Sequence, residues 1–293
     1  MASAALVAHE SGLFSFKTPA SDRAPYDVVF RAPTEHNWSL TQLYDSEVPP
    51  RHAAEFRERL GKTLALRNIR TAYAPTVRHM SGVVLNGRKF TDETPLSCGV
   101  RILRPSHPCD GVPLERFGSF LMSAGGCLLL VLSGSGLRGP VCIAAHAGRN
   151  SLVDMYLILK NKPSRSDHSI VNAMARHARL LGLRLKDATL RIFGGIPWQA
   201  FPHARDDPDH GRSNRMLLAY LDVHYDGEMV RIRDDGAECI CISTLAQRQA
   251  ELAGIGTVRI EWELPLNGAF AYTRHQDPAL AGRVRNLVDV VRR

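Results

Sequence analysis

Short apolar runs alternate with turn residues in the middle of the chain. Phe120–Met122 and Cys127–Leu132 are runs of strand length, and Val141–Ala145 is a third. The segment between the last two, Ser133–Gly139, is rich in Gly and Ser and predicts a turn. Apolar runs of this kind, bounded by turn residues, are typical of buried strands. The pattern therefore predicts a hairpin, and the rest of the chain is organised around it.

Four segments are predicted as helices: Pro49–Leu66, Ser169–Leu183, Ser243–Ala253 and Ala279–Val291. In the first two, apolar residues recur three and four positions apart, as they do on one face of a helix. In the third, Ser243 or Thr244 is the predicted N-cap and Gly254 the predicted end, because hydroxyl side chains cap helix starts and Gly terminates helices.

Further strands are predicted at Tyr26–Arg31, Val83–Leu85, Gly99–Leu103, Thr189–Phe193, Met216–His224, Met229–Arg233, Glu238–Ser243 and Thr257–Glu263. Asn86-Gly87 predicts a hairpin-type turn, and Phe201–Ser213 a charged loop that is either disordered or a lid. We expect residues 1–25 to be a loose or partly paired N-terminal arm. No Gly/Ser-rich or charged linker divides the remainder, so 26–293 is predicted to be a single domain of the α/β (α+β) class.

The composition is that of an ordinary globular protein, with 44% hydrophobic and 23% charged residues among 293. The central apolar run, Cys127–Leu132, is far shorter than the roughly 18 residues that a membrane helix needs. The first residues lack the basic and apolar regions of a signal peptide. We therefore expect a cytoplasmic protein with no membrane partner.

The chain is basic, with a formal net charge of +8 and a pI of about 9.4. Such a charge permits nucleic acid, anionic surfaces or phosphorylated substrates as partners. The Lys and Arg residues are dispersed, however, and no basic run alternates with aromatic residues, which make up only 7%. We therefore predict a solvated basic surface and not a nucleic-acid platform. The sequence makes no prediction of the oligomeric state.

The six cysteines are too sparse for a disulfide scaffold in a chain of this length. No CxxC pair occurs, which argues against a zinc ribbon. Cys239 and Cys241 alternate along a predicted strand, so both side chains point to one face. A metal site is one interpretation of this pair, and two buried thiols is the interpretation that we favour.

Cys127 and His146 are the candidate reactive residues of the predicted hairpin. Cys127 opens the first strand after Gly125-Gly126, where the backbone can turn tightly, and His146 ends the second strand. A hairpin of this size brings the start of its first strand near the end of its second. We therefore expect one thiol and one imidazole to meet at one edge of a sheet. The alternative is a buried cysteine and a histidine bonded to a backbone carbonyl.

Four motifs along the chain resemble those of the laccase-domain family, also called the YfiH or polyphenol-oxidase family. Val77–Gly82 contains His79 and is similar to the family's Q-V-H-G segment. Asp110-Gly111 matches an acidic-Gly pair, Gly125–Cys127 lies where the family has A-D-C, and Ala145–Asn150 resembles A-H-A-G-W-R-G.

The resemblance spans roughly residues 38–291. Toward the two ends it rests on Leu40, Asp45, Phe56-Arg57, Phe270–Arg274 and Gly282-Arg283. It implies a CNF/YfiH-like fold, which is a layered αββα sandwich with mixed sheets.

The resemblance also implies a zinc site made by His79, Cys127 and His146. Two imidazoles and a thiolate are good zinc ligands, and three protein ligands leave one position for water. The family was first described as a copper laccase and is now described as purine nucleoside phosphorylase and adenosine deaminase. We therefore expect zinc as the cofactor rather than copper, with a nucleoside and phosphate as ligands. By position, Arg57 and Arg149 are the candidates for binding phosphate.

Several residues depart from the family pattern. Gly126 stands where the family has Asp, and Arg149–Ser151 stands where it has Trp-Arg-Gly. An alternative follows from Ser123–Cys127, which is similar to the nucleophile segment of cysteine deamidases of the cytotoxic-necrotizing-factor and CheD type. In that alternative Cys127 attacks a glutamine carboxamide and His146 is its base. A third possibility is a protein-interaction member with a degenerate site.

Overall fold

The computed structural model describes residues 5–9, 13–17, 26–32, 39–77, 82–162, 168–200, 210–225, 227–265 and 285–293. Eight strands form the first sheet: β1 (Ala5–His9), β2 (Leu13–Lys17), β3 (Tyr26–Arg31), β4 (Thr71–Tyr73), β5 (Phe90–Pro95), β6 (Arg101–Pro105), β8 (Ser119–Ala124) and β15 (Asn286–Arg292). Five strands form the second: β7 (Gly111–Pro113), β9 (Leu128–Gly136), β10 (Gly139–Ala147), β11 (Thr189–Gly194) and β14 (Thr257–Trp262). A separate small pair consists of β12 (Val230–Ile232) and β13 (Glu238–Ile240).

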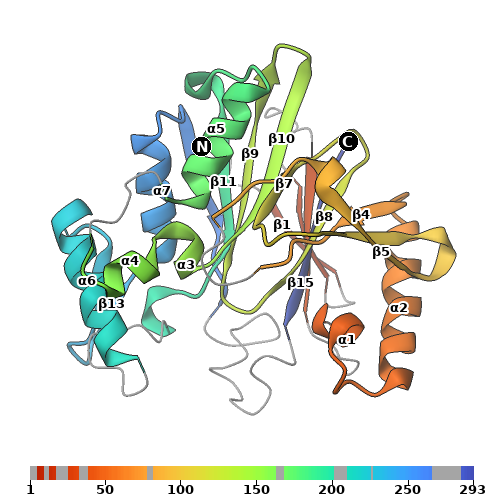
Figure 1. Ribbon diagram of the computed structural model, residues 1–293, viewed down its shortest axis with the longest axis horizontal. Coiled ribbons are helices and arrows are strands. Elements are labelled where there is room, and N and C mark those ends of the chain that lie inside the picture. The colour runs from red at the N-terminus through yellow and green to blue at the C-terminus, as the bar shows by residue number, and fades with distance from the viewer. Residues whose placement is uncertain are drawn as a thin grey trace.

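The helices lie on the two outer sides of the paired sheets (Figure 1). On the first sheet they are α1 (Thr41–Tyr44) and α2 (Pro50–Ala65). On the second they are α3 (Arg149–Leu152), α4 (Met155–Leu159), α5 (Ile170–Leu180), α6 (Gly211–Tyr225) and α7 (Ile242–Leu252). The strand orders are β1-β2-β3-β15-β8-β4-β6-β5 and β14-β11-β9-β10-β7. Since both sheets contain parallel and antiparallel pairs, the fold is the αββα sandwich with mixed sheets that the resemblance predicted.

Strand β9 explains the most apolar run of the sequence. Leu128, Leu130 and Leu132 pack against the helices, while Leu129 and Val131 lie in the core between the sheets. Successive side chains of a strand point to opposite faces, so a strand covered on both faces needs apolar residues at every position. β9 is also the central strand of its sheet, paired with β10 on one side and β11 on the other.

The hairpin of β9 and β10 is longer than predicted, because the Gly- and Ser-rich segment is mostly strand. Residues 133–136 pair with 139–142, which leaves Leu137 and Arg138 at the tip. The glycines there serve close packing. A Cβ on Gly134 would lie 2.6 Å from Cδ1 of Leu183, and one on Gly136 would lie 2.7 Å from the carbonyl oxygen of Leu181.

The predicted helices at 49–66, 169–183 and 243–253 are confirmed as α2, α5 and α7. Ser169 caps α5, since its hydroxyl accepts a hydrogen bond from the Asn172 backbone N–H at 3.1 Å. The start of α7 differs from the prediction, because Cys241 and not Ser243 or Thr244 is the N-cap residue. Gly254 follows the helix with φ +83°, a conformation that favours glycine.

Two predicted elements are wrong. Met216–His224 is not a strand but part of α6, because Asn214, Leu217 and Leu221 recur at helical spacing on its buried side. The predicted final helix is instead strand β15 from Asn286 onward, while 279–284 lie outside the described residues. β15 pairs with β3 and β8 and is buried on both faces, so its Val-rich apolar run matches a central strand.

Smaller differences concern the segments between the main elements. Only Val84 of the predicted strand 83–85 forms a bridge, and it pairs with Gly111. Asn86 does not open a hairpin turn but caps a 3-10 helix, Gly87–Lys89. Within the N-terminal arm, β1 and β2 pair with each other, and β2 pairs with β3, which extends the first sheet. Of the predicted charged loop, 201–209 lie outside the described residues, and the part from Gly211 belongs to α6.

A buried ion triad joins the end of α2 to the first sheet. Asp289 of β15 forms ion pairs with Arg31 of β3 and with Arg67, which follows α2. The side chains of Asp289 and Arg31 are 0% and 4% exposed. Burial lowers the pKa of both arginines to about 10, so Asp289 is needed to compensate their charge. In the described part of the chain, no helix has the length and apolar character to cross a membrane.

Candidate active site

The structure brings Cys127 and His146 together at the ends of paired strands. Cys127 immediately precedes β9, and the β9–β10 register places Leu128 opposite Ala147 and Leu129 opposite His146. The thiol and the imidazole are joined by a hydrogen bond. A Cβ on Gly148 would lie 3.4 Å from Sγ of Cys127 and 3.3 Å from Cε1 of His146, so a residue without a side chain keeps this corner open.

Asp110 holds the other side of the His146 ring. Its buried carboxylate accepts hydrogen bonds from Nδ1 of His146 at 3.1 Å and from the hydroxyl of Ser151 at 2.8 Å. Because a carboxylate only accepts, Nδ1 carries a proton and Nε2 is left for Cys127. Gly111 makes this placement possible: a Cβ there would lie 2.7 Å from Cβ of Ala145, so only glycine lets the chain approach β10 so closely.

The charges around the pair favour a thiolate beside an imidazolium. Burial raises the pKa of the Cys127 thiol, but the attraction and hydrogen bond of His146 and the charge of Arg285 together lower it below its usual value. Burial lowers the pKa of His146, whereas Cys127 and Asp110 raise it, and the net shift is upward. A thiolate is the form of cysteine that binds metals and attacks carbonyl carbons.

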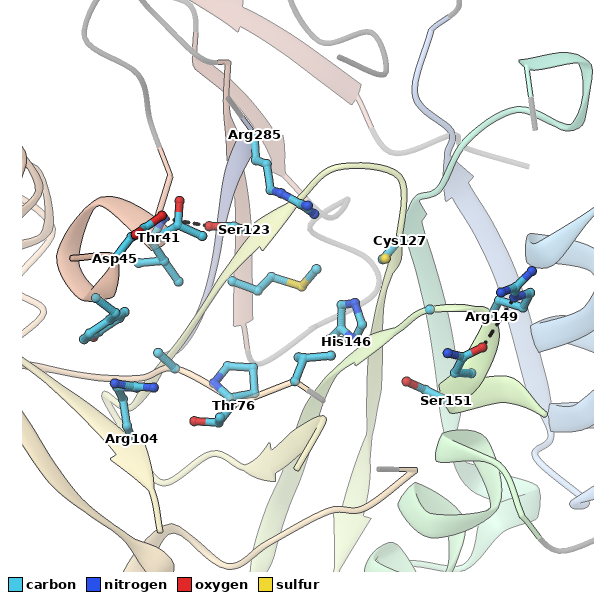
Figure 2. A pocket seen from close by; sticks show the side chains of 18 residues that line it. Thr41, Asp45, Thr76, Arg104, Ser123, Cys127, His146, Arg149, Ser151 and Arg285 are labelled. Atoms are coloured by element: carbon cyan, nitrogen blue, oxygen red, sulfur yellow. Dashed lines mark hydrogen bonds between the residues drawn. The ribbon is translucent and has the colours of Figure 1, made fainter. Parts of the chain in front are cut away.

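Cys127 and His146 face a cavity of about 990 Å³, which we call the Cys127 cleft (Figure 2). Its walls come from α1, from the chain after β4, from β6 and β8, from α3 and from the residue before β15. Its charged lining residues are Asp45, Arg104, Arg149 and Arg285. The volume is at the upper end of the range that small-molecule sites occupy.

The candidate phosphate-binding arginines lie differently from the expectation. Arg149 lines the cleft, but its guanidinium donates to Asn150 at 3.3 Å and to Asn214 at 3.4 Å and points away from Cys127 (Figure 2). Arg57 is exposed on α2 and is not among the residues that line the cleft. Neither guanidinium therefore stands beside the thiol.

The third expected zinc ligand, His79, lies outside the described residues. The described residues on either side of 78–81 are at the cleft or next to its wall. Val77 lines the cleft, and a Cβ on Gly82 would lie 3.8 Å from the carbonyl oxygen of Ser151, which also lines it.

Two side chains at this site were missed as functional residues by sequence reasoning. Asp110 had a signal, the acidic-Gly pair, but nothing indicated that it would bond His146. Arg285 had no local signal, because it reaches the site only if the segment after it is a central strand, and that segment was predicted as a helix.

Among the described residues, no group of three or more His, Cys, Asp or Glu side chains is arranged to hold a metal ion. Cys127 and His146 nevertheless suit zinc. A thiolate and an imidazole are adjacent, and the imidazole is oriented by a carboxylate, as metal-binding histidines usually are. The other candidate pair is structural: Cys239 and Cys241 are both buried, and Sγ of Cys241 accepts a hydrogen bond from the Thr244 hydroxyl at 3.0 Å.

No protein-family model matches the sequence, and no curated protein matches it. Solved structures match over nearly the whole chain. A Neisseria meningitidis protein of family DUF152 has a TM-score of 0.59 at 14% identity, covering 96% of this chain and 98% of its own. The chain has the YfiH-like fold. YfiH from Bacillus licheniformis, a hypothetical protein, has a TM-score of 0.58 at 11% identity and 96% coverage of both chains.

YlmD from Geobacillus stearothermophilus has a TM-score of 0.62 at 14% identity, with 98% of both chains covered. These likenesses confirm the YfiH-like fold that the sequence resemblance predicted. At such low identity they show the fold alone, so the chemistry of this chain has to be argued from its own residues.

Proposed function

We propose that the chain is a zinc-dependent enzyme that acts on purine nucleosides, by phosphorolysis or by deamination. The observation that supports this best is the chain of hydrogen bonds that joins Cys127 to His146 and His146 to Asp110 at the wall of a large cleft. Cys127 and His146 would hold the metal together with His79. Held by these residues, zinc would supply a water ligand acidic enough to give hydroxide near neutral pH.

The residues of the chain itself orient and bind. Asp110 fixes the proton of His146 on Nδ1, and Ser151 donates to the same carboxylate oxygen, which holds the carboxylate in place. The cleft has room for a nucleoside and a phosphate ion together. Arginine side chains in its wall suit the phosphate, because a guanidinium donates two parallel hydrogen bonds to an oxyanion.

Protein purified without added metal is expected to contain about one zinc per chain, measured by elemental analysis. Cys127→Ala should lose most of this zinc, because it removes a thiolate ligand, whereas Cys98→Ala should keep it, because Cys98 is an exposed thiol away from the cleft. Circular dichroism checks that both variants are folded. Folded wild-type protein free of metal would argue against the zinc site.

The same three proteins can be incubated with adenosine, inosine and methylthioadenosine, with and without phosphate. We expect base release that depends on phosphate, or deamination, in the wild type and in Cys98→Ala but not in Cys127→Ala. If the zinc-loaded wild type converts none of these nucleosides at high enzyme concentration, the nucleoside assignment is wrong.

A second candidate function is supported by the same geometry. In a cysteine deamidase the Cys127 thiolate would attack the carboxamide carbon of a glutamine side chain, and the imidazolium of His146 would protonate the departing ammonia. Water would then hydrolyse the thioester, returning the thiol and leaving glutamate. The lowered pKa of Cys127 and the carboxylate behind His146 favour this chemistry.

The rate of alkylation by iodoacetamide separates the two candidates. In metal-free protein near neutral pH, Cys127 is expected to react faster than the exposed Cys98, because its lowered pKa keeps more of it as thiolate. The rate should fall only as the pH drops below this lowered pKa, and His146→Ala should slow it. Site-resolved mass spectrometry measures both thiols.

Protection of Cys127 in the purified protein, removed by a chelator, would support zinc. Fast reaction without a chelator would support the thiol enzyme. Slow reaction under both conditions would leave a degenerate site.

A further inference from the structure

Arg285 stands directly beside the reacting pair. It precedes β15, and a Cβ on Gly125 would lie 2.9 Å from its Nη1, so its guanidinium lies against the backbone that leads into Cys127. In Figure 2 it points toward Cys127. Its Nε is buried and has no hydrogen-bond partner among the described residues. Buried donors without an acceptor are costly, so this group is suited to an anionic ligand in the cleft next to Cys127.

A second cation lines the cleft at a distance from the first. Arg104 lies on β6, and its guanidinium carbon is 3.9 Å from the centroid of the Tyr44 ring, which also lines the cleft. This stacking holds the plane of the guanidinium in place. Its carboxylate contact is loose, 3.7 Å to Asp92, whose side chain is 62% exposed. Such a contact leaves most of the five N–H donors of Arg104 available.

The order of strands keeps these two arginines apart. β15 and β6 are separated by β8 and β4, which is three strand spacings, or about 14 Å between backbones. Figure 2 shows Arg285 above and to the left of Cys127, and Arg104 at the lower left beside Thr76. The guanidinium of Arg104 is held on Tyr44 and that of Arg285 lies against Gly125, and the two do not converge in Figure 2, so they suit two different anions.

Thr76 follows β4, the strand between β8 and β6 in the first sheet, and lines the cleft beside Arg104 (Figure 2). A ligand that reaches from Arg104 to the Cys127 side of the cleft has to be extended and to carry an anionic group at one end. A nucleoside with a phosphate on its sugar has this shape and charge.

We propose that the Cys127 cleft takes a purine nucleoside monophosphate in preference to the neutral nucleoside. Arg104 binds the phosphate of the substrate, and Arg285 binds the inorganic phosphate beside Cys127. This inference rests on the proposed function for the purine moiety and the second phosphate. The anion site at Arg104 does not depend on the proposed function. It is inferred from the stacking on Tyr44, the loose contact with Asp92 and the strand order.

Calorimetric titration with adenosine, adenosine monophosphate and inorganic phosphate tests the proposal without requiring turnover. Wild-type protein is expected to bind the monophosphate at least tenfold more tightly than adenosine, since charged hydrogen bonds of this kind correspond to about 10–100-fold in affinity. Arg104→Gln should remove this preference and leave adenosine within twofold. Arg285→Gln should weaken inorganic phosphate about tenfold and keep the preference.

Arg101→Gln is the matched control, because Arg101 is an exposed residue of the same strand that pairs with Glu93 and does not line the cleft. It should bind all three ligands as the wild type does. Equal binding of adenosine and the monophosphate by wild-type protein, no binding of the monophosphate, or loss of the preference in Arg285→Gln alone would overturn the assignment. If the monophosphate binds through Arg104 but neither ligand is converted, the proposed enzyme function fails and the binding site stands.

Discussion

Asp110→Asn is expected to lower zinc affinity and activity by about 10–100-fold while leaving the protein folded. The carboxylate of Asp110 is fully buried and accepts hydrogen bonds from both His146 and Ser151. An amide keeps the size of the side chain and one acceptor oxygen but loses the negative charge. His146 would then keep at most a neutral acceptor at Nδ1, which supports its basicity less than a carboxylate does.

Zinc affinity is measured by competition with a chelator, and activity as kcat/KM with the best nucleoside substrate. Asp92→Asn is the matched control, because Asp92 is an exposed carboxylate on β5 that contacts Arg104 only loosely; its zinc affinity should equal that of the wild type. Ser151→Ala should have a smaller effect than Asp110→Asn, since it removes one of the two hydrogen bonds and no charge. Unchanged zinc affinity and alkylation rate in Asp110→Asn would show that the carboxylate does not act on the pair.

Asp289→Ala is expected to destabilise the protein by about 3–5 kcal/mol. Removing this carboxylate leaves Arg31 buried without a counter-charge and deprives Arg67 of the same partner. The arginine side chains are held between the first sheet and the end of α2, so Arg31 has no easy route to solvent. Urea unfolding followed by circular dichroism measures the change as a lower midpoint with an unchanged slope.

Asp27→Ala provides the comparison for this second prediction. Asp27 lies on β3 and pairs with Arg293, whose side chain is 57% exposed, so its loss should cost less than about 1 kcal/mol. If Asp27→Ala and Asp289→Ala lowered the free energy of unfolding by similar amounts, the argument from buried charge would be contradicted. Replacing Asp289, Arg31 and Arg67 together by apolar residues should recover much of the stability, because no uncompensated charge then remains.

The parts of the fold that local patterns determine were predictable from the sequence. The unbroken apolar run of β9 predicted a strand buried on both faces, and the hairpin connection was enough to bring Cys127 and His146 together. The helices α2 and α5 followed from the spacing of their buried residues.

The errors arose where a short apolar run fits two periodicities. Leu217, Leu218 and Leu221 occur in a run that was assigned to a strand, although their spacing is that of one helix face. The converse error, a strand predicted as a helix, occurred at Leu287, Val288 and Val290. A central strand has apolar residues on both faces and therefore lacks the apolar–polar alternation that would identify it. Whether this segment forms a helix or a strand depends on its pairing with β3 and β8, and these strands are distant in sequence.

The same dependence on distant neighbours limited the prediction of the site. Asp110 reaches His146 only because Gly111 pairs with Ala145, and Arg285 reaches Cys127 only because β15 pairs with β8. Neither pairing has a signature within a short window of sequence.

The position of β9 at the centre of its sheet separates the geometry of the reacting residues from the choice of ligand. In many enzymes a change in one of these properties disturbs the other. Cys127 and His146 lie at the ends of β9 and β10, the longest strands in the described part of the chain, and buried central strands are where local opening is rarest. The arginines of the cleft are supplied by other strands and by α3. Ligand preference can therefore diverge, one arginine at a time, while the reacting atoms keep their geometry, and this gives the architecture a capacity for new specificities.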